Sequence, residues 1–260
     1  MRDLSCKLPT NISAPNQINS RAKATIYIGN PTFNGFDNKR IRSQFVSKVY
    51  SILTVQLLAT SALIAWFTLH QPTKVYFQQS GAPWLYAALG VGMVVYFVLI
   101  CIESTRRSFP LNFILLTLLT ISYGLIAAVL SSRFNTITVL CAFGATALAT
   151  IAVMLMAKYA PFDITTCGCG LCILGLLHLI VGLLLIVILV PLGYASTASL
   201  LIAASGAFLV SLYMLFDLQL IMGGRANELS PEEYILGAVL LYIDIIQLFQ
   251  YMLILFGRNE

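Results

Sequence analysis

Charged residues are scarce in this sequence. Only 10% of the 260 residues are Asp, Glu, Lys or Arg, whereas a soluble domain carries roughly 25%. Hydrophobic residues make up 59% of the chain, and the mean hydropathy is +0.88. So few charges cannot cover a surface that faces water. The composition therefore excludes an ordinary soluble domain and indicates an integral membrane protein.

The first part of the chain lacks two other features. Residues 1–45 contain no apolar segment of the kind that a cleavable signal peptide needs, so we expect the first span to act as a signal anchor. Aromatic and basic residues do not alternate there, and we expect no nucleic-acid partner.

The polar composition of residues 1–40 predicts a disordered tail, followed by a transmembrane domain over residues 41–260. The net charge of +5 favours weak attraction to anionic membrane lipids.

Seven continuous apolar stretches follow the tail, each close to the ~20 residues that cross a bilayer as a helix. They cover residues 46–69, 84–102, 111–130, 136–157, 171–190, 198–222 and 234–256. They are apolar throughout rather than alternating, which argues against membrane strands. The sequence therefore predicts an all-α membrane protein with seven transmembrane helices.

The distribution of Lys and Arg predicts the orientation. Twelve of these residues lie on the side of the tail, in or near it and in the even-numbered connections, against three on the other side. Because cytosolic segments carry the excess of positive charge, we expect the N-terminus to be cytosolic. Seven full spans would place Glu260 on the lumenal or external side, whereas a re-entrant last segment would return it to the cytosol.

Two acidic residues, Asp217 and Asp244, stand well inside the last two spans. Acids at this depth are costly and mark functional sites by default. Ser230 to Glu233 has the pattern of a helix start, with Ser230 as N-cap and Glu233 closing a capping box. From that start Asp244 would lie about 20 Å along its helix, and Asp217 about 9 Å from Gly223. The depths differ by about two turns, so contact requires a tilt.

If Asp217 and Asp244 do meet, they can share one proton and titrate as a unit. Such a pair can sense protons, bind a cation or do both; the alternative is that each acid only fixes helix packing. Near the end of the second span, Arg106 and Arg107 form either a solvated basic flank or a cation that neutralises the acids.

Two further groups of residues have simpler interpretations. The cysteines at positions 167, 169 and 172 are candidates for metal binding or palmitoylation, but no second cysteine pair or nearby histidine supports a metal. We interpret the segment as small residues at the mouth of a helix. His178 stands alone in its span and is interpreted as a packed residue. We expect no cofactor.

Several separate stretches resemble the transmembrane Bax inhibitor motif family, and its Lifeguard-like branch especially. The most specific are Phe216-Asp217-Leu218-Gln219 and Leu241-Tyr242-Ile243-Asp244. The full set covers residues 41–57, 103–113, 159–166, 216–224, 229–238 and 241–245. They occur in the family's order and at similar spacing, so the resemblance extends over roughly residues 40–258.

The resemblance implies a fold in which six helices surround a central last helix. It also implies a pH-sensitive calcium leak channel of the endoplasmic reticulum or Golgi that restrains apoptosis. The family's paired aspartates fall on Asp217 and Asp244, which would sense pH and contact calcium ions transiently. An arginine latches to that pair in the family's closed form, and its counterpart here is Arg106 or Arg107. Apoptosis regulators or other channels are the expected partners.

Other classes of membrane protein fit less well. An intramembrane aspartyl protease carries Gly-x-Gly-Asp at its second aspartate, whereas this chain has Tyr242-Ile243-Asp244. A serine protease would need Gly-x-Ser-Gly, and Ala203-Ala204-Ser205-Gly206 lacks the leading glycine. A seven-helix receptor would have the same number of spans as this chain. However, the motifs on the cytosolic side of this chain do not resemble the G-protein contacts of such receptors. A non-conducting anti-apoptotic scaffold that acts through protein partners remains the main alternative to a channel.

Overall fold

The computed structural model describes residues 35–257, and the side chains of residues 39–257. Its long helices are α1 (Gly35–Leu69), α3 (Ala82–Cys101), α5 (Leu111–Ser131), α6 (Thr136–Tyr159), α7 (Gly168–Leu189), α8 (Ala195–Met222) and α9 (Tyr234–Phe256). All seven are long and apolar enough to cross a membrane, and the described residues contain no strand. The predicted all-α, seven-helix fold is therefore confirmed.

Three short helices in the connections were not predicted. They are α2 (Gln71–Ser80), α4 (Glu103–Arg107) and the 3₁₀ helix η1 (Thr165–Cys167). The predicted boundary between tail and membrane domain, after residue 40, falls inside α1, which begins at Gly35. The rest of the predicted disordered tail lies outside the described residues.

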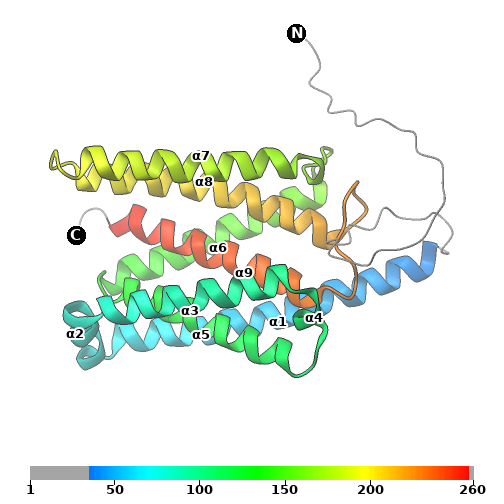
Figure 1. The fold of residues 1–260 in the computed structure, drawn as a ribbon, viewed down its shortest axis with the longest axis horizontal. Helices are drawn as coiled ribbons and strands as arrows, with labels where there is room; N and C mark the ends of the chain where they lie inside the picture. Colours follow the sequence, from blue (N-terminus) through cyan, green and yellow to red (C-terminus); the bar gives the residue numbers. More distant parts are fainter. Residues whose placement is uncertain (1–34, 258–260) are drawn as a thin grey trace, which may run out of the picture.

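The long helices are arranged in layers (Figure 1). α7 and α8 pack against each other on one side, α1, α3 and α5 form the other side, and α6 and α9 lie between them. α9 packs against α1, α3, α5, α6 and α8, whereas α7 packs mainly on α8 and η1. The last helix thus contacts both sides of the molecule.

A buried polar network joins three of these helices at the middle of the core. The hydroxyl group of Tyr242 on α9 lies 2.8 Å from that of Thr60 on α1 and donates a hydrogen bond to the carbonyl of Thr120 on α5. The amide of Gln56 donates to the hydroxyl of Thr120. Such bonds between helices replace the water that hydrocarbon cannot supply, and they hold α9 against α1 and α5.

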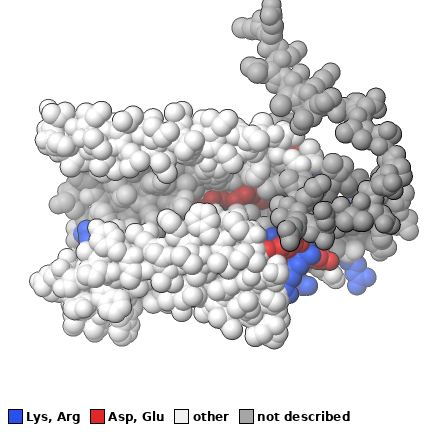
Figure 2. All heavy atoms as spheres, in the orientation of Figure 1, with Lys and Arg blue, Asp and Glu red and all other residues white. Residues whose placement is uncertain are grey.

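The two ends of the helix bundle differ in charge. One end, called here the basic end, contains α4, the connection between α6 and α7, and the connection between α8 and α9. Its cations on described residues are Lys39, Arg40, Arg42, Lys48, Arg106, Arg107, Lys158 and Arg225. At the opposite end, Lys74 of α2 donates to the carbonyl of Phe134. Figure 2 shows the charged atoms gathered near α4.

Candidate functional site

Asp217 and Asp244 meet in the interior of the molecule. Their carboxyl groups are joined by a hydrogen bond, and both residues are buried, with 9% and 7% of their surface exposed. They are the only acids inside the seven candidate spans of the described chain. Oδ2 of Asp244 has no hydrogen-bond partner among the described residues. A direct hydrogen bond between two carboxyl groups requires a proton on one of them.

The start of α9 explains part of how the two acids come together. The helix begins at Tyr234 rather than at Ser230, so Asp244 lies only about 15 Å along it. The sequence placed Asp244 about one turn too deep, because it counted the turn before Tyr234 as helix. α8 and α9 are antiparallel neighbours in close contact, and the corrected start reduces the difference in depth between Asp244 and Asp217 from about two turns to about one.

The acid pair lies beside a hollow between the layers. Figure 2 shows acidic atoms recessed between the α7–α8 layer and the α3 side, apart from the charges at the basic end. The phenol groups of Tyr96 on α3 and Tyr213 on α8 lie close enough to interact electrostatically with both carboxyl groups.

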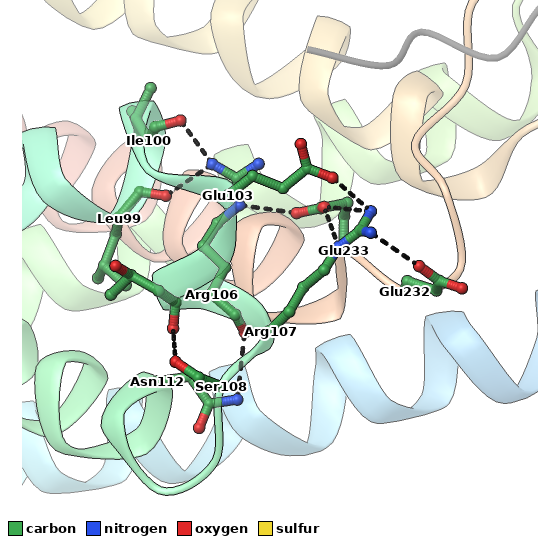
Figure 3. A network of polar contacts seen from close by, with 10 residues as sticks. Leu99, Ile100, Glu103, Arg106, Arg107, Ser108, Asn112, Glu232 and Glu233 are labelled. Atoms are coloured by element: carbon green, nitrogen blue, oxygen red, sulfur yellow. Dashed lines mark hydrogen bonds and ion pairs between the residues drawn. The ribbon is translucent and has the colours of Figure 1, made fainter. Parts of the chain in front are cut away.

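Arg106 ties the end of α3 to the start of α9 (Figure 3). Its Nε donates to Oε2 of Glu233 at 2.7 Å, and both side chains are more than nine-tenths buried. Its Nη1 donates to the carbonyls of Leu99 and Ile100 in the last turn of α3. These carbonyls have no partner within their own helix, so the arginine caps one helix while it holds the start of another.

Arg107 binds the same glutamate from a more exposed position (Figure 3). It contacts Oε1 of Glu233 through Nε and Nη2, and forms ion pairs with Glu103 and Glu232 at 2.8 and 3.1 Å. Glu233 is the N-cap residue of α9, but its side chain makes no capping bond. The predicted capping box is therefore wrong, because the two arginines occupy the carboxylate.

The predicted arginine latch on the aspartates is not what the structure displays. Between residues 39 and 257, no ion pair joins Arg106 or Arg107 to Asp217 or Asp244. The arginines instead hold Glu233 at the N-terminus of the helix that carries Asp244. Their contact with the acid pair is indirect, through the position of α9.

A third arginine anchors the other end of the same connection. Arg42 on α1 donates to the carbonyl of Leu229 at 2.6 Å, and forms an ion pair with Glu228 at 2.9 Å. Its guanidinium occupies the space beside Gly223, where a Cβ atom would lie. Gly223 has φ 70° and ψ −172°, a conformation that essentially only glycine adopts. The glycine thus lets α8 end directly against the arginine.

Asp163 fixes the middle of the connection. Its carboxylate accepts hydrogen bonds from the amide and hydroxyl groups of Thr165 and from the amide of Ala226. Burial disfavours its charge, but these bonds and the nearby Arg225 outweigh burial and hold the pKa of Asp163 below its ordinary value. Arg225 in turn donates to the carbonyl of Ala160. The α8–α9 connection is thus tied to the α6–α7 connection as well.

The sequence contained signals for these anchors that we interpreted differently. Glu233 was assigned to a capping box, and Asp163 was noted only within a stretch that resembles the family. Arg42 lies in another such stretch, residues 41–57, and otherwise counts only as positive charge. Each forms contacts with residues distant along the chain, and local patterns do not encode such contacts.

A cleft of about 330 Å³ opens beside this cluster. Its polar wall includes Arg106, Arg107 and Glu233, and its apolar floor includes Phe216 and Leu236. Phe216 immediately precedes Asp217 in the sequence, but neither Asp217 nor Asp244 lines the cleft.

The remaining candidate residues have other surroundings. The described residues contain no group of three or more His, Cys, Asp or Glu side chains that could hold a metal ion. His178 lies 3.3 Å from the hydroxyl of Ser205 and stacks edge-on against Tyr251, which fits the predicted packing role. Cys167, Cys169 and Cys172 are free and exposed at the beginning of α7.

The fold and this site define a class of protein: a seven-helix membrane protein with a buried acid pair and an arginine-held α8–α9 connection. A sequence profile described as "Inhibitor of apoptosis-promoting Bax1" matches residues 42–260. The chain is 37% identical over 225 residues to human Protein lifeguard 3, covering 86% of this chain and 72% of the relative. It is 32% identical to mouse Protein lifeguard 4, covering 82% and 84%. The chain belongs to the Bax inhibitor and lifeguard family of anti-apoptotic membrane proteins.

Proposed function

We propose that this protein is a pH-sensitive calcium leak channel that lowers stored calcium and thereby restrains apoptosis. The observation that carries the proposal is the buried hydrogen bond between Asp217 and Asp244 beside the hollow. Carboxylate oxygens are the ligands that Ca²⁺ prefers, and this pair is the only acidic site inside the spans of the described chain. The protein would reside in the endoplasmic reticulum or Golgi with its N-terminus in the cytosol.

The shared proton supplies the pH response in this proposal. While one proton joins the carboxyls, α8 and α9 are held together at that depth. Removing the proton places two negative charges next to each other in a medium of low dielectric, where they repel strongly. A cation or a movement of the helices must then compensate. Proton binding and cation passage are thus coupled at one pair of side chains.

The arginine cluster acts on this gate through α9. Arg106 and Arg107 fix the beginning of α9. Asp244 lies ten residues after Tyr234, the first residue of this helix. We assign the latch to the contact with Glu233, which resists movement of α9 when the acid pair separates. Neither part of the mechanism requires an enzymatic reaction, and we propose a protein without catalytic activity.

The test is calcium flux from liposomes that contain the purified protein, measured from about pH 5 to 8, the range in which a shared buried proton can titrate. Asp217→Asn and Asp244→Asn should each alter the leak and flatten its pH dependence. Glu232→Gln is the matched control, because it neutralises an exposed carboxylate outside the spans.

Two results would contradict this proposal. An unchanged pH profile in both aspartate variants would remove the pair as the sensor. No flux at any pH from correctly folded protein would favour the non-conducting scaffold, which acts through protein partners.

A further inference from the structure

We propose that the beginning of α7 is a site of S-acylation, in which Cys167 and Cys169 carry long-chain fatty acids as thioesters. Cys167 is the last residue of η1, and Cys169 lies in the first turn of α7. Both side chains are exposed and free of disulfides. Exposed cysteines at the junction between a connection and a membrane helix are the usual substrates of reversible acylation.

The surroundings of the two thiols suit a bound acyl chain. The helix that follows has the highest mean hydropathy of the seven candidate spans, 3.1. Its outer surface carries large exposed apolar side chains, including Ile173, Leu176 and Leu177. An acyl chain attached in the first turn can therefore extend into the bilayer along an apolar helix surface, while its thioester stays at the interface.

Among the described residues, neither thiol takes part in a strong hydrogen bond or a metal-binding group. The sulfur of Cys167 lies 3.8 Å from the hydroxyl of Thr166, a weak contact, and the described residues contain no metal-binding group that includes either cysteine. Cys172 lies in the same candidate span, Thr165–Leu189, but three residues further along α7 than Cys169, and near enough to Tyr213 of α8 to interact electrostatically with its phenol. The proposal therefore names Cys167 and Cys169 and leaves Cys172 out.

The fold also gives this modification a consequence. The candidate span that contains α7 has the smallest buried share of the seven, and α7 packs mainly on α8. Cys169 also lines the cleft beside Arg106 and Arg107. Acyl chains here would fix the beginning of the most loosely packed helix at the membrane interface and cover one side of that cleft.

The chemistry balances with a fatty acyl-coenzyme A thioester as co-substrate. The cysteine sulfur attacks the acyl carbonyl, a new sulfur–carbon bond forms, and the bond to coenzyme A breaks. The proton of the cysteine thiol ends on the departing coenzyme A thiol. No oxidant or reductant takes part.

The experiment is metabolic labelling of the full chain in cells with an alkyne-bearing palmitate, followed by cleavage with neutral hydroxylamine, which releases thioesters. Changing Cys167 and Cys169 to Ser together should remove most of the hydroxylamine-sensitive label. Cys141→Ser is the matched control, because Cys141 is equally exposed but lies on α6 in the half near the opposite end. Correct folding is checked in each variant by its thermal stability in detergent.

Three results would overturn the proposal. The wild-type chain could carry no hydroxylamine-sensitive label, or the label could persist in the double variant. It could also disappear only when Cys6, Cys101, Cys141 or Cys172 is changed. The labelling reports on the thiols and not on conduction, so it can fail while the channel proposal stands, and the reverse also holds.

Discussion

Two buried carboxyl sites on the same helix are neutralised in different ways. Asp244, in the middle of α9, shares a hydrogen bond with Asp217 and forms no ion pair within residues 39–257. Glu233, at the start of α9, is held by two arginines, one of them equally buried. The first site depends on a proton that can leave, whereas the second depends on cations that remain charged at all physiological pH values.

This difference separates a titratable contact from a permanent one. A proton bridge between carboxyls is lost when the pH rises, and the acids then repel each other. The arginine contact with Glu233 does not depend on a shared proton. α9 is therefore fixed at its start by arginines, and its middle is held only while the two carboxyls share a proton. A pH-dependent movement of α9 would need this arrangement.

The largest effect on stability should come from breaking the permanent contact. Glu233→Gln leaves the buried guanidinium of Arg106 without its anion, and removing one partner of a buried pair costs about 3–5 kcal/mol. The variant should unfold at a clearly lower temperature in detergent. Arg107→Gln is the control: its side chain is 39% exposed, and an exposed pair contributes only about 0–1 kcal/mol.

Asp244→Asn sharpens this contrast, because an amide can still hydrogen-bond to Asp217 without a shared proton. Its thermal stability should remain close to that of the wild type while its leak loses pH dependence. A loss of stability as large as that of Glu233→Gln would show that the two sites do not differ as described.

The sequence predicted much of the fold but little of this contrast. Six of the seven spans were placed within three residues of the observed helix ends, because a bilayer imposes a continuous apolar run of about 20 residues on each. The exception is α1, which begins 11 residues before its predicted span. The two aspartates stood out for the same reason. The pairing of Arg106 with Glu233 could not be predicted, since it joins residues 127 positions apart. A local capping pattern suggested a different use of that glutamate.

Gly223 and Gly224 offer a smaller, more local test of how α8 is joined to α9. Both have positive φ, 70° and 74°, so an alanine at either position costs about 1–2 kcal/mol of backbone strain. Only at Gly223 would the added methyl group also meet the guanidinium of Arg42, since the space around Gly224 is open. Gly223→Ala should therefore lower the thermal stability more than Gly224→Ala. Equal losses would show that Arg42 does not restrict the end of α8.

Asp163 should give the smallest effect, and one that depends on pH in the opposite sense to the acid pair. Its hydrogen bonds outweigh burial and lower its pKa in the folded state, so the folded chain favours the charged form. The stabilisation is present above the unfolded pKa of about 3.9 and is lost as the pH falls below it. Thermal unfolding measured on both sides of that value should show an acid-induced loss in the wild type that Asp163→Asn lacks, worth about 1 kcal/mol, the contribution of one hydrogen bond. An equal acid-induced loss in both proteins would mean that Asp163 does not anchor the connection. Asp163 is already fully charged near neutrality, so this test does not bear on the proposed pH response of Asp217 and Asp244.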